Sequence, residues 1–438
     1  MVIVFALVAL LVLSVVVVGN WWMWRRLFRD TTRAPGLVRR VGVVVIAGGW
    51  ALTIGGLVAE RTGAPFWLQQ VLAWPGFLWL ALAMYLMLGV LAGELVRPLL
   101  RRWLERRARA GEAEAVPAPE PEPVPVAAVG PADPPPPSAT DSPTDSATDT
   151  PADSTTPPGG PLATPTRRLF VSRVIAGTAA AAAVGTVGYG TYGVLRGPKV
   201  KRVTVPLAKL PRAAHGYRIA VVSDIHLGPV LGRGFAQKVV DTINGTQPDL
   251  IAVVGDLVDG SVKDLGPAAA PLAGLRARHG AYFVTGNHEY FSGAEQWIEE
   301  VRRLGLRPLE NARTELPHFD LAGVNDVAGE SEGQGPDFAK ALGDRDRARA
   351  CVLLAHQPVQ IHDAVDHGVD LQLSGHTHGG QLWPGNLVAG LANPTLAGLE
   401  RYGDTQLYVS RGAGAWGPPT RVGAESDITV IELASRQA

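Results

Sequence analysis

The stretch LQLSGHTHGGQLWP, residues 371–384, places His376 and His378 on a glycine-rich loop directly after a short apolar run. An apolar run of this length, bounded by turn residues, is typical of a buried β-strand. Two histidines separated by one residue on a loop usually point in different directions. The stretch therefore predicts a strand whose carboxyl end presents two imidazoles to two different points.

The same arrangement recurs at four earlier positions in the chain. Apolar runs cover 217–223, 250–255, 281–286 and 351–355. The polar residues that follow them are, in order, Asp224 and His226, Asp256 and Asp259, Asn287 and His288, and His356. Each run thus delivers a residue that can bind a metal or move a proton.

Further apolar runs at 319–324, 406–410 and 428–433 alternate with helical patterns at 234–244 and 294–304. Strands that alternate with helices predict a layered α/β domain. In open α/β sheets, ligands bind at the carboxyl edge of the strands, so we expect the polar residues to meet there.

Each polar residue also has an ordinary explanation. A histidine after a strand is usually a hydrogen-bonded loop residue, an aspartate there often caps a helix, and Asn-His occurs in turns. Five repeats of the same placement favour one shared site. Two divalent ions about 3.5–4 Å apart can clamp the attacking and leaving oxygens of a phosphoryl transfer. A carboxylate can bridge such a pair, and imidazoles complete the shells without adding charge.

The motifs D-x-H, G-D-x-x-D, G-N-H-E, a lone H and G-H-x-H, in this order, resemble the calcineurin-like metallophosphoesterases. The resemblance covers about 215–434 and is greatest to bacterial phosphodiesterases that are membrane-associated or exported by the twin-arginine route. It implies a four-layer αββα sandwich with two divalent metal ions. Mn²⁺, Fe and Zn²⁺ all suit mixed oxygen and imidazole ligands, so the metal stays open.

The resemblance also implies a role for each motif residue. Asp224, His226 and His378 would hold one metal, Asn287, His356 and His376 the other, and Asp256 would bridge them. A hydroxide bridging the metals would attack phosphorus. His288 would stabilise the transition state or protonate the leaving oxygen, unless it is a surface residue at a helix start. Asp259 would orient a ligand instead of binding metal.

The remaining candidate residues match no motif. We expect surface or loop positions for His215, His279, His318, His362 and His367, and a buried position for Cys351. Four residues of Gly/Pro-rich loops, Trp383, Arg411, Trp416 and Arg421, should border the mouth of the site. They could contact substrate or pack locally, and the sequence leaves both open.

The first 110 residues carry three long apolar runs, at about 2–19, 41–59 and 72–93. Runs of this length predict three transmembrane helices in a membrane region, residues 1–110. Arginine clusters follow the first and third runs, which by the positive-inside rule places those ends in the cytoplasm. The alternative is buried helices in a soluble core.

Residues 111–166 are rich in Pro, Ala, Ser, Thr and Asp, which predicts a disordered linker. Residues 167–199 begin with Arg167 and Arg168 before a weakly apolar stretch, which indicates either a twin-arginine export signal or a fourth transmembrane helix. Both alternatives place the metallophosphoesterase domain, residues 200–438, outside the cytoplasm.

Composition narrows the function further. The net charge is +0 and the domain lacks a basic stripe, so we expect no nucleic-acid partner. The single cysteine excludes an intrachain disulfide and a cysteine-rich zinc site.

The sequence predicts a multi-pass, membrane-anchored hydrolase of phosphodiester or phosphoanhydride bonds, whose substrate could be lipid-linked. The alternatives are a pyrophosphatase acting on a nucleotide-linked lipid and a non-catalytic metal-binding membrane sensor. The oligomeric state is left open.

Overall fold

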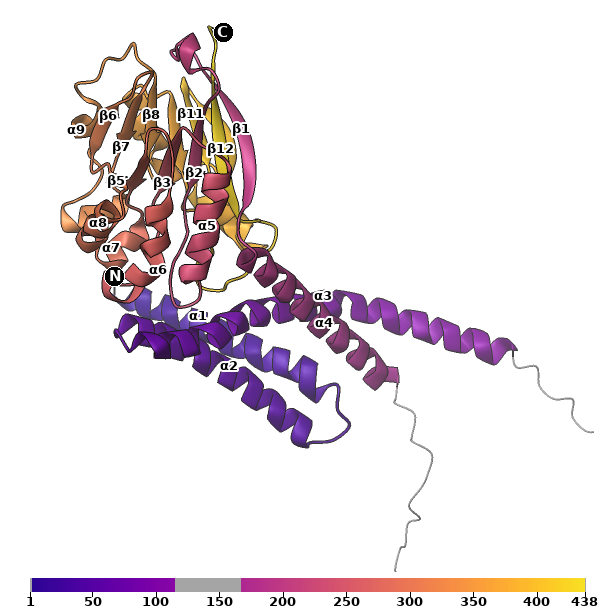
Figure 1. Cartoon of the computed structure of the whole chain (residues 1–438). Helices are drawn as coiled ribbons and strands as arrows, with labels where there is room; N and C mark the ends of the chain where they lie inside the picture. Colours follow the sequence, from indigo (N-terminus) through magenta and orange to yellow (C-terminus); the bar gives the residue numbers. More distant parts are fainter. Residues whose placement is uncertain (1, 115–166, 438) are drawn as a thin grey trace, which may run out of the picture.

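The computed structural model describes residues 2–114 and 167–437. It contains an amino-terminal helical region and an α/β domain that lies above it in the view of Figure 1. The predicted disordered linker falls outside the described residues, apart from its first four positions. Those positions, 111–114, continue a helix. This corrects the predicted boundary: glutamate and alanine favour the helix there, and the first proline comes only at 117.

Two six-stranded mixed sheets form the centre of the α/β domain. The first sheet has, in spatial order, β1 (Lys199–Leu207), β12 (Asp427–Ser435), β2 (Tyr217–Val222), β3 (Leu250–Val254), β4 (Ala281–Val284) and β5 (Arg307–Pro308). The second has β10 (Gly398–Tyr402), β11 (Thr405–Val409), β9 (Leu371–Ser374), β8 (Cys351–Leu354), β7 (Asp320–Gly323) and β6 (Ala312–Glu315). Strands β2 to β5 run parallel, as do β7, β8, β9 and β11.

Helices cover the outer face of each sheet. Against the first sheet lie α5 (Arg233–Gly245), α6 (Val262–Ala269) and α8 (Ala294–Arg303). Against the second lie α9 (Phe338–Leu342) and α10 (Ile361–Asp366). Between the sheets, apolar residues such as Val221 and Val254 meet Leu321 and Leu373. Because both faces of β3 and β8 are covered, these strands are apolar throughout. The four-layer αββα prediction is confirmed.

The helical region consists of α1 (Val2–Trp24), α2 (Leu37–Arg61), α3 (Phe66–Glu114) and α4 (Arg167–Leu195). Within the described residues, three helices have the length and composition to cross a membrane: α2, α3 and α4. That α1 crosses stays a prediction. Small residues let the helices approach closely. The hydroxyl of Thr53 on α2 donates to the Gly76 carbonyl on α3 (2.7 Å), and Gly89 on α3 faces Ala179 on α4.

Charged residues join the helices at one end of the region. Glu94 on α3 pairs with Arg26 (2.8 Å) and with Arg97 (2.9 Å). Arg97 also donates to Ser172 on α4 (3.2 Å). These contacts hold three parts of the chain close together: the segment after α1 and the arginine-rich ends of α3 and α4. Such an arrangement would suit a shared membrane boundary.

Candidate metal centre and active site

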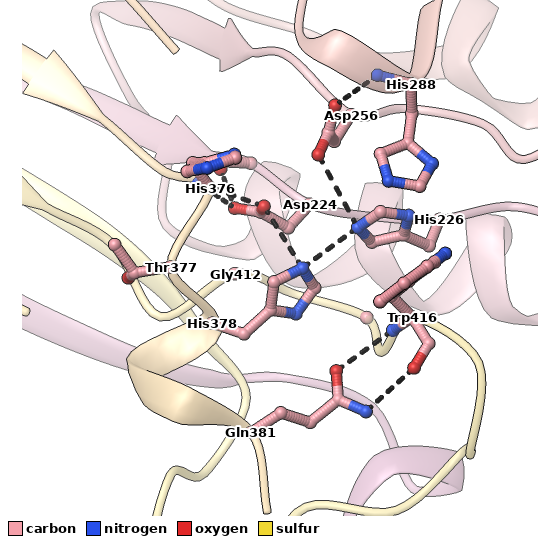
Figure 2. Close-up of polar contacts among 12 residues, drawn as sticks. Asp224, His226, Asp256, His288, His376, Thr377, His378, Gln381, Gly412 and Trp416 are labelled. Carbon is pink, nitrogen blue, oxygen red and sulfur yellow. Dashed lines mark hydrogen bonds and ion pairs between the residues drawn. The ribbon is translucent and has the colours of Figure 1, made fainter. Parts of the chain in front are cut away.

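Five parallel strands end at the same edge of the α/β domain. Strands β2, β3 and β4 belong to the first sheet, and β8 and β9 to the second. Each is followed by residues that the sequence singled out. The structure brings all of these residues together at this edge, which we call the catalytic edge. Figure 2 labels Asp224, His226, Asp256, His288, His376 and His378 there.

A first group consists of Asp224, His226 and His378, whose ligand atoms lie within 4.8 Å of one another. The Nε2 atoms of His226 and His378 are 3.0 Å apart, and His378 Nε2 is 3.3 Å from Asp224 Oδ1. All three side chains are buried. Two imidazole nitrogens and a carboxylate aimed at one point form a donor set that suits a divalent transition metal.

A second group consists of Asp256, His356 and His376, again within 4.8 Å. Asn287 joins it, since its Oδ1 is 3.0 Å from His376 Nδ1. The ring of His356 is fixed by a 2.8 Å hydrogen bond from Nδ1 to the Val254 carbonyl. Its Nε2 is fully buried, 3.1 Å from Asp256 Oδ2, yet makes no hydrogen bond in the described part of the chain. A buried imidazole nitrogen without a hydrogen-bond partner fits a metal ligand, because a bound cation would satisfy its lone pair.

Asp256 lies between the two groups. Its Oδ2 is 3.1 Å from His356 Nε2 in the second group and 3.8 Å from His226 Nε2 in the first. Its Oδ1 accepts a 2.9 Å hydrogen bond from the His288 backbone. A carboxylate in this position could contact a cation in either group.

The two histidines of the 371–384 stretch serve different groups, His378 the first and His376 the second. Both adopt a left-handed backbone conformation, with φ of 53° and 72°. Asp224, His226 and Asp256 do the same, with φ of 52°, 48° and 52°. Such conformations cost about 1–3 kcal/mol each for residues other than glycine and persist where the surroundings enforce them. Backbone strain is therefore concentrated in the candidate ligands.

Gly286, directly before Asn287, is required by close approach. A Cβ atom there would meet the backbone nitrogen and the side chain of Asp256. The glycine of the G-N-H-E motif therefore lets the β4 loop pack against the residue that lies between the two groups.

Asp259 connects His226 to His288. Its Oδ1 accepts from His226 Nδ1 (2.9 Å) and from His288 Nδ1 (2.7 Å). The hydrogen bond to His226 directs the other ring nitrogen, Nε2, into the first group. The same contact leaves His288 Nε2 as the atom that could reach a substrate. These contacts suit an orienting residue, but the ligand atoms of Asp259, His226 and His288 also lie within 4.8 Å of one another, so the orienting role stays a prediction.

The charge states at this edge follow from burial and neighbours. Burial and nearby His356 lower the pKa of His376 to about 4, and burial with His226 and Arg421 holds the pKa of His378 well below its usual value. Both imidazoles are therefore neutral at pH 7, which is the form that binds metals. Burial opposes ionisation of Asp256, but the neighbouring histidines, His356 first, keep its pKa well below the usual range.

His288 and His356 behave in the opposite way. Burial disfavours the charged imidazole of His288, but the hydrogen bond and charge of Asp259 outweigh it and raise its pKa to about 9. Burial also opposes protonation of His356, yet Asp256 and Asp224 raise its pKa well above the usual value. A cation bound beside these carboxylates would take the place of the His356 proton.

Glu289 has a structural role that the sequence did not reveal. Its buried carboxylate accepts hydrogen bonds from the backbone of Asp256 (2.9 Å), Leu257 (2.8 Å) and Gly286 (2.6 Å). It thereby ties the loop after β3 to the loop after β4. The sequence did offer one signal. Glu289 lies three residues after Gly286, which precedes α7 (Asn287–Ser292), and this is the position of a helix-capping glutamate.

The four loop residues expected at the mouth have different environments. Arg421 is buried and braces His378, donating to its carbonyl (3.0 Å) and lying 3.1 Å from its Nδ1. Local packing is therefore the correct alternative for Arg421. Trp416 is 58% exposed with its ring 5.6 Å from that of His288, and Trp383 is 54% exposed farther along the loop. Arg411 lies half-buried beside Gly379.

The unassigned residues also have clear positions. His215 and His362 are exposed, and His279, His318 and His367 are partly exposed. None of these five belongs to a candidate ligand group among the described residues. Cys351 is buried within β8, as predicted.

A two-sheet α/β sandwich with carboxylates and imidazoles gathered at one edge defines a class of metal-binding domain. Residues 217–380 match the family described as calcineurin-like phosphoesterase. A transmembrane protein with a metallophosphoesterase domain from Danio rerio is 39% identical over 259 residues, which cover 56% of this chain and 59% of that protein. A metallophosphoesterase of Helicobacter pylori is 38% identical over 58% of this chain and 68% of its own length. One from Aquifex aeolicus is 33% identical over 54% and 92%.

The chain therefore belongs to the calcineurin-like metallophosphoesterases, a family of metal-dependent phosphoester hydrolases. The match covers about three fifths of the Danio rerio protein.

Proposed function

We propose that this protein is a membrane-anchored phosphoesterase that hydrolyses phosphodiester or phosphoanhydride bonds outside the cytoplasm. The observation that carries the proposal is the pair of ligand groups on either side of Asp256. Asp224, His226 and His378 would hold one divalent ion and Asn287, His356 and His376 a second, with Asp256 shared. Mn²⁺, Fe and Zn²⁺ all fit these donors.

When bound, two divalent ions would supply charge to neutralise the phosphoryl oxygens and to activate water as the nucleophile. The chain's own contribution is to hold the ligands in neutral or ionised form and in fixed orientation. Asp259 orients His226, Arg421 braces His378, and Glu289 fixes the backbone of Asp256.

His288 is the residue best placed to move a proton. Its Nδ1 is engaged by Asp259, and its raised pKa of about 9 keeps the ring protonated at neutral pH. Nε2 could therefore donate to the leaving oxygen as the P–O bond breaks, or stabilise charge on the phosphoryl group.

The experiment that tests the proposal is the substitution Asp256→Asn in the full chain. With Mn²⁺ and bis-p-nitrophenyl phosphate, we expect kcat/KM to fall by at least about 10²–10³-fold, because several kcal/mol of transition-state stabilisation depend on the ions. The matched control is Asp241→Asn, at an exposed position on α5. Undiminished turnover in Asp256→Asn would defeat the proposed site.

The proposed topology rests on the arginine clusters. The clusters after α1 and on α3 would be cytoplasmic, α4 would return to the outside, and the α/β domain would follow there. Arg167 and Arg168 at the start of α4 would act as a twin-arginine export signal. We expect the double substitution of both residues by Lys to block export, as measured by protease access to the domain in intact cells. Normal export would leave α4 as an ordinary transmembrane helix.

A further inference from the structure

An apolar segment lies exposed beside the catalytic edge. It begins at Leu382, directly after the loop that carries His376 and His378, and includes α11 (Gly385–Ala392). No acidic or basic residue occurs from 382 to 399. Leu387, Val388 and Leu391 are 64%, 70% and 90% exposed and lie on one face of the helix, at spacings of one and four residues. Exposed apolar clusters of this kind usually mark an interaction surface.

This segment contacts two helices of the amino-terminal region, α3 and α4. The Tyr85 hydroxyl on α3 donates to the Trp383 carbonyl (2.9 Å). Leu382 and Val422 pack against the cluster in which Tyr85 of α3 meets Val187 of α4. A second contact lies nearby, between the hydroxyls of Thr191 on α4 and Thr420 (2.7 Å). The first residues of the apolar segment, Leu382 and Trp383, therefore contact α3 and α4.

The depth of this attachment indicates what covers the segment. Tyr85 precedes Arg97 by twelve positions on α3, which is about 18 Å of helix. If Arg97 marks the cytoplasmic boundary, Tyr85 lies inside a hydrocarbon layer about 30 Å thick, and tilting the helix only reduces the distance. The Trp383 carbonyl bonded to Tyr85 lies at the same depth. Lipid acyl chains are the material present there.

The segment also borders the reaction site. The side chain of Gln381 accepts from the Trp416 backbone nitrogen (3.0 Å) and donates to its carbonyl (2.9 Å), as Figure 2 shows. The exposed rings of Trp416 and Phe291 lie 5.6 Å and 5.5 Å from the ring of His288. Exposed aromatic rings therefore lie beside His288, and Gln381, the residue before the apolar segment, is hydrogen-bonded to one of them, Trp416.

The membrane helices approach His288 from another direction as well. Glu60, in the last turn of α2, interacts electrostatically with Asp259 and His288. Phe66, the first residue of α3, packs against the outer core cluster of the first sheet. The catalytic edge thus faces the ends of α2 and α3 instead of open solvent alone.

We propose that Trp383 and α11 insert into the outer leaflet, and that the substrate is a phosphoester of a membrane lipid. The acyl chains stay in the leaflet along α11 while the phosphoryl group reaches the ligand groups beside His288. The substrate half of this inference rests on the proposed phosphoesterase function, and the insertion half rests only on the proposed topology.

Insertion is tested with a fluorophore on the full chain in nanodiscs. Leu391→Cys carries the label, and Ala348→Cys, an exposed position before the amino end of β8, is the matched control. Native Cys351 is buried and burial raises its thiol pKa to about 12, so it stays unlabelled. We expect spin-labelled phosphatidylcholine to quench Leu391→Cys about fivefold more than Ala348→Cys.

Two results would overturn insertion. Equal quenching by spin-labelled lipid at both positions, with iodide reaching both, would mean that α11 lies in water. Protection of Leu391→Cys from both quenchers would mean that a protein, such as a second copy of the chain, covers it.

The substrate class is tested with p-nitrophenyl hexadecyl phosphate in vesicles and p-nitrophenyl ethyl phosphate in solution. In both, water adds to phosphorus and the bond to p-nitrophenolate breaks, leaving the alkyl phosphate. We expect kcat/KM to favour the hexadecyl ester by at least about tenfold, and Leu391→Asp but not Ala348→Asp to abolish that preference. Turnover of both esters without a preference, or a preference that survives Leu391→Asp, would overturn the lipid assignment and leave the phosphoesterase function intact. Failure to hydrolyse either ester would instead contradict the proposed function.

Discussion

The catalytic edge and the helical region use polar groups in opposite ways. At the edge, buried carboxylates and imidazoles converge from five strands, and several hold strained backbone conformations. In the helical region, close contacts rest on glycine and alanine, and the ion pairs gather at the arginine-rich end. The arrangement of the catalytic edge therefore depends on individual polar atoms, whereas the helical region depends mainly on close packing of small residues. Single substitutions that delete one polar group should have large effects at the edge and small effects in the helices.

The largest effect that sharpens this contrast is expected for His288→Ala. Loss of the proton donor should lower kcat by about 10²–10⁴-fold while metal binding is retained. The control is His215→Ala, at an exposed position before the amino end of β2. Steady-state kinetics on bis-p-nitrophenyl phosphate, with calorimetry for Mn²⁺, separates the two properties. Wild-type kcat in His288→Ala would show that the residue takes no part in catalysis.

A smaller effect is expected for Arg421→Met, which removes the brace of His378. Residues that orient ligands typically contribute about 10–100-fold to metal affinity. Calorimetric titration with Mn²⁺ should show a loss of this size, and Arg421→Lys should recover part of it by keeping the charge. Arg401→Met, at an exposed position on β10, is the control. If Arg421→Met folds and binds Mn²⁺ like the wild type, the arginine does not position His378.

The smallest effect is expected for Tyr85→Phe in the helical region. The substitution deletes one hydrogen bond, to the Trp383 carbonyl, so the free energy of unfolding should fall by about 0.5–1.5 kcal/mol. Thermal unfolding in detergent, compared with Tyr192→Phe at a 63% exposed position, would measure it. A loss several times larger would show that a single polar atom matters as much in the helices as at the edge.

The motif residues could be predicted because metal chemistry demands particular side chains at strand ends. Asp224, Asp256 and His356 each follow an apolar run that predicts a buried strand. Because ligands bind at the carboxyl edge of such strands, these residues were expected to lie close together. Their roles as metal ligands stay a prediction, which a structure with bound metal would test.

The supporting residues could not be predicted, because their roles depend on tertiary contacts. Arg421 lies 43 positions from His378, in a loop whose composition does not distinguish a buried brace from a residue at the mouth. Strand β1 was missed because Lys199, Lys201 and Arg202 hide its alternating pattern, and β5 has only two residues. The insertion of β12 between β1 and β2 rests on long-range pairing that no local pattern reveals.

The central claim, a dinuclear centre shared by Asp256, is tested most directly by anomalous diffraction from crystals of the full chain grown with Mn²⁺. We expect two manganese peaks about 3.5–4 Å apart, one beside each ligand group and both in contact with the Asp256 carboxylate. A single peak, or two peaks that do not share Asp256, would contradict the account.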